Sequence, residues 1–344
     1  MHICFFGASV TKQDKDHQTR TLITGYVTQL EKMLSEQQEG YTVSRLASGS
    51  NYIGDAGITY IHKVVEKKPD ICVLDWSTSG NTECSDETIS FLYSELLSNR
   101  IWPITVVFPR RDRNQSETEI AIKQRQFCST HNLPFLDLTP RFEKATLEQY
   151  VRDTVHTTEE GAIKYAEYLL PEIISSSAND QLFDQFKTQK RVFHVSEFPI
   201  ELPHNTPVDA ISISVKKPFW RKLPRNAKIK ILMDVKIGPF SGFVEVRKKA
   251  GSSDTAQLLQ TKAIYDRWCY YDRDCLKALT DWIEFPVGKV LIEQIQKQPD
   301  FIQHEDKCNY KAREKQLIPK GSLYTITNVP NLRVEYQLNK SLFD

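Results

Sequence analysis

In the first half of the chain, short hydrophobic runs alternate with longer stretches in which apolar residues recur every three or four positions. Short apolar runs rich in β-branched and aromatic residues predict buried strands, and the longer amphipathic stretches predict helices. The alternation is typical of βαβ units that build a parallel sheet covered on both faces. We therefore expect an α/β domain with three αβα layers. Its five predicted parallel strands are His2–Phe6, Tyr41–Leu46, Ile71–Trp76, Ile104–Phe108 and Phe135–Leu138.

Helical spacing fills the intervals between those strands. The predicted helices contain the repeat Leu22, Tyr26, Leu30 and Leu34, then Ile61–Val65, Ile89–Leu97, about Glu117–His131, and a last helix that starts at Thr157 and continues through Leu170. Thr157 and Glu160 have the Thr-x-x-Glu spacing of a capping box, in which the hydroxyl caps the first turn and the Glu reaches back. This spacing predicts that the last helix begins at Thr157.

The pattern changes after Ile174, where a polar segment, Ser175–Asp180, separates the helical half from a half with strand-like runs. Alternating or continuous apolar runs between Pro, Gly and Asn breaks predict strands. Those runs are Ala210–Val215, Ile229–Ile237, Phe243–Val246, Val290–Ile295, Leu323–Ile326 and Leu332–Tyr336. We expect two domains, an α/β domain over 1–178 and a β-rich accessory domain over 190–344.

The charge balance narrows the classes of partner. The 344 residues include 45 Lys and Arg and 44 Asp and Glu, so there is no overall field that would attract nucleic acid or an anionic membrane. No apolar run approaches the roughly 20 residues that span a bilayer, and the amino-terminal residues lack the features of a signal peptide. We expect neither a nucleic-acid nor a membrane partner. The oligomeric state is left open.

The cysteines favour a reducing compartment. There are seven, and Cys4 and Cys72 fall inside apolar runs, where a free thiol behaves as a small hydrophobe. Cys269 and Cys275 are not followed by ligands at zinc spacing. We therefore expect a cytoplasmic protein without a metal site or cofactor.

Two segments carry the residue types of nucleophilic catalysis. Ligands of open parallel sheets bind beyond the carboxyl ends of the strands, and the first strand runs directly into Gly7-Ala8-Ser9. Asp153 and His156 lie three residues apart just before the last helix. A serine nucleophile requires a base, and the base requires a partner that fixes its tautomer. Taken separately, each segment would more often be an ordinary turn.

Together, Gly-x-Ser after the first strand and Asp-x-x-His before the last helix resemble the SGNH or GDSL hydrolase family over about residues 1–175. The resemblance implies a flavodoxin-like fold and a catalytic triad of Ser9, His156 and Asp153. The family motif is Gly-Asp-Ser, and Ala8 occupies the Asp position here. Because that position is not the nucleophile, Ser9 keeps its predicted role.

The resemblance also implies an oxyanion hole, formed by the Ser amide, a Gly amide after the second strand and an Asn side chain after the third. Gly49 occupies the first of these loops. In the second, Asn81 is the nearest match, although it comes later than the family pattern Gly-x-Asn-Asp expects. Asn51, Thr78 or Ser79 are alternatives for the third donor.

Arginines and aromatic residues suggest what the substrate is. Three arginines follow the fourth strand, Arg110, Arg111 and Arg113, and guanidinium groups suit an anionic substrate such as an acidic sugar, although such a run is more often a solvated loop. In the second half, aromatic side chains offer surfaces on which sugars stack, or they form ordinary packing. These are Trp268, Tyr270, Tyr271 and Trp282.

The sequence thus predicts a serine esterase that acts on a small-molecule or glycan ester. Accessory β domains are frequent among carbohydrate O-acetyl esterases of the resembling family, which favours removal of acetyl groups from a carbohydrate. Two alternatives remain: an O-acyltransferase with the same triad, and a non-catalytic module that binds a glycan or a protein on this fold. A lipase or thioesterase is a further possibility.

Overall fold

The computed structural model describes residues 1–13, 24–37, 40–49, 51–79, 84–187, 193–199, 228–237, 243–249, 256–263, 273–284, 289–295 and 331–337. The chain divides into two compact units, Met1–Arg191 and Val192–Asp344. No helix of the described part is long and apolar enough to cross a membrane.

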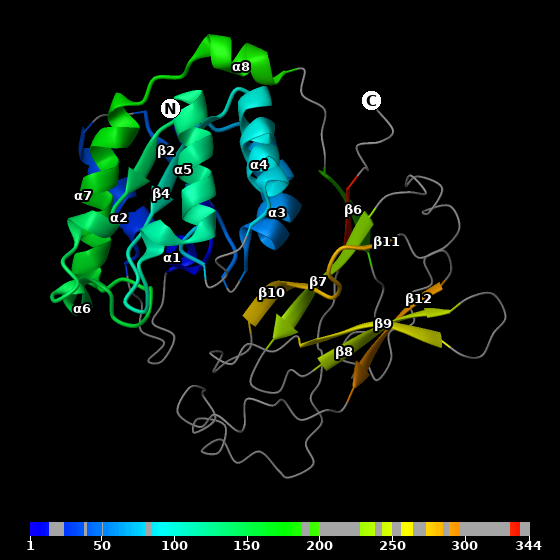
Figure 1. Ribbon diagram of the computed structural model, residues 1–344. Coiled ribbons are helices and arrows are strands. Elements are labelled where there is room, and N and C mark those ends of the chain that lie inside the picture. Colours follow the sequence, from blue (N-terminus) through cyan, green and yellow to red (C-terminus); the bar gives the residue numbers. More distant parts are fainter. Residues whose placement is uncertain are drawn as a thin grey trace. The chain divides into compact units, whose positions relative to one another are not determined.

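A five-stranded parallel sheet forms the centre of the first unit (Figure 1). The strand order is β2-β1-β3-β4-β5, and every neighbouring pair is parallel. β1 and β3 are almost wholly buried, as their continuous apolar sequences require. The predicted three-layer αβα fold is confirmed. The strands are β1 His2–Gly7, β2 Thr42–Ala47, β3 Ile71–Asp75, β4 Trp102–Val107 and β5 Phe135–Asp137.

Helices cover both faces of this sheet. Crossovers between parallel strands are right-handed, and the direction of strand addition reverses after β2. The helix between β1 and β2 therefore lies on one face, where it packs against α7, and the next three helices follow one another on the other face. The helices are α2 Tyr26–Gln37, α3 Ile58–Lys67, α4 Asp86–Ser98, α5 Glu119–His131 and α7 Glu159–Ser175.

Short helical segments gather where the strands end. Two of them, α1 and α6, lie at the lower edge of the unit in Figure 1, which is the carboxyl edge of the sheet. A π-helix follows β2, a rare element that is frequent at functional sites. These segments are α1 Ser9–Lys12, η1 Ile53–Gly57, η2 Gln115–Glu117, η3 Thr139–Arg141 and α6 Leu147–Tyr150.

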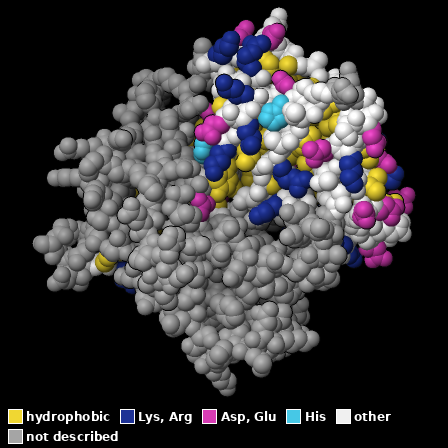
Figure 2. All heavy atoms as spheres, turned by 180° about the vertical axis from the view of Figure 1, so that it is seen from behind, with side chains coloured by type: hydrophobic (Ala, Val, Ile, Leu, Met, Phe, Trp, Pro, Cys, Tyr) yellow, Lys and Arg dark blue, Asp and Glu magenta, His cyan; other side chains and the backbone are white. Residues whose placement is uncertain are grey.

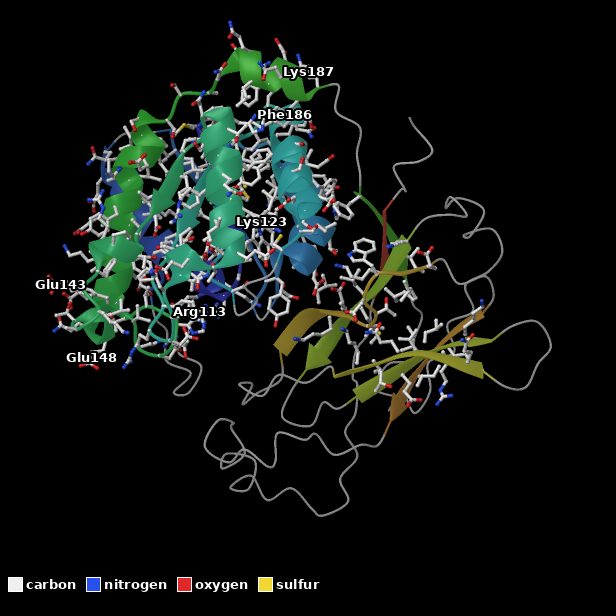
Figure 3. All side chains as sticks on the ribbon, in the orientation of Figure 1. Arg113, Lys123, Glu143, Glu148, Phe186 and Lys187 are labelled. Atoms are coloured by element: carbon white, nitrogen blue, oxygen red, sulfur yellow. The ribbon has the colours of Figure 1, made fainter. Side chains whose placement is uncertain are left out.

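The helix α8, Asp180–Phe186, closes the opposite edge of the first unit, beyond the expected boundary at residue 178. Phe183 packs edge-on against Trp102, with 6.0 Å between the ring centroids. Phe186, labelled in Figure 3, lies 6.3 Å from Phe127 of α5. This apolar face explains why the first unit extends past the polar segment that suggested a boundary.

The predicted start of the last helix was wrong by one residue. α7 is capped by Thr158, whose hydroxyl accepts a hydrogen bond from the Gly161 amide at 3.0 Å. Thr157 is instead buried, and its hydroxyl and its amide both donate to the side chain of Gln13. The capping-box spacing was misleading because the Thr157 hydroxyl binds Gln13, a residue distant in sequence, instead of capping the helix.

The described residues of the second unit form antiparallel sheets, which confirms the expected β-rich half. One sheet has the order β10-β7-β13-β6, with β11 paired to β7, and another has the order β12-β8-β9. The predicted runs Ala210–Val215 and Leu323–Ile326 lie outside the described residues. The strands are β6 Phe193–Pro199, β7 Lys228–Ile237, β8 Phe243–Lys249, β9 Ala256–Ala263, β10 Arg273–Ala278, β11 Ile283–Glu284, β12 Lys289–Ile295 and β13 Asn331–Gln337.

Candidate active site

The predicted nucleophile stands where β1 turns into α1. A Cβ atom at Gly7 would lie 2.6 Å from the Thr11 hydroxyl and 2.8 Å from the Asp75 carbonyl, so this turn requires glycine. The Ala8 amide donates to the same Asp75 carbonyl at 3.2 Å. Ser9 then begins α1 and is partly exposed. The close approach of β1 and β3 therefore places Ser9 at the carboxyl edge of the sheet.

Asp153 and His156 are brought together in a hairpin between α6 and α7. The ends of the hairpin are held by hydrogen bonds from the Thr158 amide to the Tyr150 carbonyl and from the Arg152 amide to the His156 carbonyl, each 2.9 Å long. At its tip, Nδ1 of His156 lies 2.8 Å from Oδ2 of Asp153. This is the contact that fixes the orientation of a catalytic imidazole.

The other carboxylate oxygen of Asp153 shapes the hairpin itself. Oδ1 accepts hydrogen bonds from the amides of Val155 and His156, both at 2.8 Å. Partial burial acts to raise the pKa of Asp153, but the bond from the imidazole, its charge and the two amides hold the pKa well below its usual range. Asp153 is therefore ionised at neutral pH, as a partner of an imidazolium must be.

A buried glutamine links the hairpin to the helix that carries Ser9. Gln13 follows α1, and its Nε2 donates to the Thr157 carbonyl while its Oε1 accepts from the Thr157 amide, both at 3.0 Å. Thr157 is the neighbour of His156. The paired bonds hold the Gly-x-Ser and Asp-x-x-His segments next to each other. Sequence reasoning missed Gln13, because no local motif distinguishes it from a surface glutamine.

The loop after β2 also meets the Gly-x-Ser turn. The Ser48 amide donates to the Gly7 carbonyl at 3.0 Å. Gly49 is buried, and the Asn51 side chain closes the turn by donating to the Gly49 carbonyl at 3.0 Å and to the Ser48 hydroxyl at 2.6 Å. This loop thus contacts the turn that carries Ser9, and the role of the Gly49 amide remains a prediction.

The loop after β3 surrounds a buried carboxyl group. The side chain of Asp75 accepts hydrogen bonds from the hydroxyls of Thr78 and Thr11, the second at 2.9 Å. Burial raises the pKa of Asp75 to about 7, against the opposing effect of these bonds. Ser79 is buried in the same loop. Asn81, the predicted third oxyanion donor, lies outside the described residues.

The predicted substrate arginines differ in what they contact. Arg110 is nearly buried, with 8% of its side chain exposed; its guanidinium forms two bonds to Asp112, at 2.8 and 2.9 Å, and one to the Thr78 carbonyl at 2.9 Å. Arg111 is 40% exposed and lies 3.5 Å from Glu148. Arg113, labelled in Figure 3, donates to the Ser79 carbonyl at 2.8 Å. Of the three, Arg111 is the one open to a ligand.

The other candidate residues of the sequence concern metal binding and carbohydrate contacts. In these ranges no group of three or more His, Cys, Asp or Glu side chains could hold a metal ion. Figure 2 shows basic and acidic side chains interspersed over the described surface seen from behind. In the second unit, the Trp282 ring packs against Phe193 at 5.5 Å. Trp268, Tyr270 and Tyr271 lie outside the described residues.

The order of the sheet and the helices on its two faces give the first unit the αβα fold that the resemblance to SGNH hydrolases implied. No protein-family model matches the sequence, and no curated protein matches it either.

Solved structures match at low sequence identity. A two-domain esterase active on acetylated mannans is 12% identical, with a TM-score of 0.58 over 98% of this chain and 92% of that chain. Its complex with mannopentaose gives the same score at 13% identity, covering 98% of this chain and 91% of that chain. A catalytic mutant of an acetylxylan esterase from Geobacillus stearothermophilus is 18% identical and covers 50% of this chain and 93% of that chain, with a TM-score of 0.42.

Proposed function

We propose that this chain is a carboxylic ester hydrolase that removes O-acetyl groups from a carbohydrate, with Ser9 as nucleophile, His156 as base and Asp153 as its partner. The observation that carries the proposal is the 2.8 Å contact between Asp153 and His156, on a hairpin that Gln13 joins to the Ser9 helix. Such a hydrogen-bonded pair next to a serine is the arrangement of nucleophilic acyl transfer.

In the proposed mechanism, His156 takes the proton of the Ser9 hydroxyl as its oxygen attacks the ester carbonyl. Ionised Asp153 stabilises the resulting imidazolium. As the bond between the carbonyl carbon and the sugar oxygen breaks, the imidazolium of His156 protonates that oxygen, so the sugar leaves as a free hydroxyl and acetyl-Ser9 remains. Water, deprotonated by His156, releases acetate and restores the serine.

The developing oxyanion needs preorganised donors. The amides of Ser9 and Gly49 are proposed for two of them. Among the alternatives for the third, Asn51 directs its amide group to Ser48 and Gly49, and the Thr78 hydroxyl donates to Asp75. Asn51, Thr78 and Ser79 all stay alternatives for the third donor, and Asn81 remains the donor that the family pattern implies.

The acetylated carbohydrate substrate is supported by the two-domain architecture shared with the esterase active on acetylated mannans. Arg111, with its exposed guanidinium, is the proposed contact for an acidic sugar. A cytoplasmic location stays a prediction.

A serine-directed fluorophosphonate tests the proposal directly. We expect it to label the wild-type chain at Ser9 and to leave Ser9→Ala unlabelled, with acetate released from acetylated mannan or xylan by the wild type alone. Labelling without hydrolysis of any ester, together with transfer of acetyl to a glycan, would reassign the chain as an O-acyltransferase. Absence of both labelling and turnover would favour the non-catalytic binding module.

A further inference from the structure

Three successive carbonyl groups of the loop after β3 are bound by side chains of the loop after β4. The Ser77 carbonyl accepts a hydrogen bond from Nε2 of Gln115. The Thr78 carbonyl accepts from Arg110 at 2.9 Å, and the Ser79 carbonyl accepts from Arg113 at 2.8 Å. We call these three donors, Arg110, Arg113 and Gln115, the carbonyl clamp.

The clamp is itself braced. Arg110 is held by its fork to Asp112, and Nε of Arg113 donates to Oε1 of Gln115 at 2.9 Å. Gln115 is fully buried, so its amide group has little freedom to turn away. A planar, delocalised guanidinium loses little further freedom when it forms such bonds. The three donors therefore act as one rigid surface against the loop.

Fixing a carbonyl fixes a whole peptide plane. In a trans peptide, the N–H of the following residue points opposite to the C=O. The clamp therefore sets the direction of the peptide planes that follow Ser77 and Thr78, and it fixes the carbonyl of Ser79. On the same loop, the Thr78 side chain is tied to Asp75 at the end of β3. In residues 77–79, main chain and side chain are thus anchored to different elements, which restrains the conformation of this segment.

We propose that Arg110, Arg113 and Gln115 are positioning residues: they hold residues 77–79 in the conformation on which presentation of the third oxyanion donor to Ser9 depends. The inference rests on the proposed esterase function. It reassigns Arg110 from substrate binding to support of the site, because three of its guanidinium contacts are made within the protein and its side chain is nearly buried.

The first test measures the loop without requiring activity. Amide hydrogen exchange in the peptide that covers residues 76–79 should be faster in Arg110→Ala and in Arg113→Ala than in the wild type. Arg125→Ala is the matched control, because Arg125 also donates to a main-chain carbonyl, that of Ser116 at 3.2 Å, but outside this loop. Unchanged exchange in both clamp variants would overturn the proposal.

The second test measures catalysis on a neutral and on an acidic acetylated sugar. Misplacement of a group by about 1 Å can cost roughly 100-fold in rate, so we expect kcat of Arg113→Ala to fall about 10- to 100-fold on both esters, with KM nearly unchanged. Arg113→Lys, which keeps one cationic donor, should recover part of kcat. Arg125→Ala should match the wild type.

Two kinetic outcomes would overturn the proposal. A loss confined to the acidic ester and expressed in KM would make the arginines substrate-binding residues. Unchanged kcat alongside faster loop exchange would mean that the clamped loop has no part in turnover. An inactive wild type that the fluorophosphonate does not label would instead overturn the proposed function. The hydrogen-exchange experiment distinguishes that result from failure of the clamp proposal, because it measures the loop without requiring activity.

Discussion

A single carboxylate, that of Asp153, both folds the hairpin and orients the proposed base. In Asp153→Asn, Oδ1 can still accept the two backbone amides, but an NH2 group would face Nδ1 of His156 and favour the wrong tautomer. We expect kcat on an acetyl ester to fall by about 10⁴-fold, with little change in the denaturant midpoint. Activity within a factor of ten of the wild type would argue against the triad.

The raised pKa of Asp75 predicts how the free energy of unfolding depends on pH. Its pKa in the folded state is about 7, above the unfolded value of about 3.9. The unfolded chain therefore releases this proton first as the pH rises, and stability is lost between about pH 4 and 7. One pKa unit corresponds to about 1.4 kcal/mol, so a difference of about 3 units lowers the free energy of unfolding by roughly 4 kcal/mol. Below pH 4 the carboxyl is neutral in both states.

The measurement is urea unfolding at pH 4.5 and pH 8 for the wild type and Asp75→Asn. We expect stability to fall more steeply in the wild type, because the Asn side chain carries no ionisable group. Asp153 does not affect the comparison, because its pKa is lowered in the folded state. Its contribution to the free energy of unfolding changes only as the pH falls below about 4, which is outside the measured range. Parallel pH profiles for the two proteins would contradict the assignment of a neutral, buried Asp75.

At the residue scale, the sequence allowed prediction of groups that stand in short motifs. Ser9, Asp153 and His156 are recognisable because they occupy fixed positions beside a strand end and a helix start. The contacts of Gln13 and Arg110 could not be predicted, because their partners, Thr157 and Thr78, are distant in sequence. A charged run such as Arg110–Arg113 looks the same whether it faces solvent or a neighbouring loop.

At the scale of elements, the start of α7 is limited by close packing against α6. A Cβ atom at Gly161 would lie 2.0 Å from the Tyr150 carbonyl oxygen. Replacing Gly by Ala in a helix ordinarily stabilises it by about 1 kcal/mol, but here we expect Gly161→Ala to destabilise by about 1–3 kcal/mol through overpacking. Because the hairpin of His156 joins these helices, turnover should fall as well.

Gly54 in the π-helix is the matched control for this substitution. Nothing lies within 4 Å of the position that its Cβ would occupy, so Gly54→Ala should leave the free energy of unfolding unchanged or slightly higher. Urea denaturation of both variants decides the question. Equal midpoints for the two substitutions would show that α6 and α7 yield to the added methyl group.

Predicted and observed elements agree best where hydrophobicity is continuous. β1 and β3 are buried on both sides, so their composition alone identifies them. β9 and β10 escaped prediction because their sequences, AQLLQTKA and RDCLKA, mix polar and apolar residues without a clear period. Such strands are specified by pairing with β8 and β7, and pairing between distant segments is not readable from local sequence.

For the whole molecule, the division into two units predicts separable tasks. A chain of residues 1–191 contains Ser9, His156 and the core of the parallel sheet, so we expect it to fold and to hydrolyse a small acetyl ester with nearly the full rate. If the β-rich unit binds the polysaccharide, this shortened chain should hydrolyse acetylated mannan much more slowly than the full chain does. Steady-state kinetics on both substrates measure this difference. Equal losses on both would assign the β-rich unit a role in stability instead.

The hydrogen bonds between Gln13 and Thr157 join residues 144 positions apart. Closing so long a segment is slow compared with local folding, and synthesis on the ribosome proceeds from the amino terminus at about 5–20 residues per second. Ser9, the proposed nucleophile, is thus synthesised long before His156, its proposed base. A nascent chain would remain chemically inert toward esters until the seventh helix has left the exit tunnel, so hydrolytic competence and completion of the first unit should coincide in time.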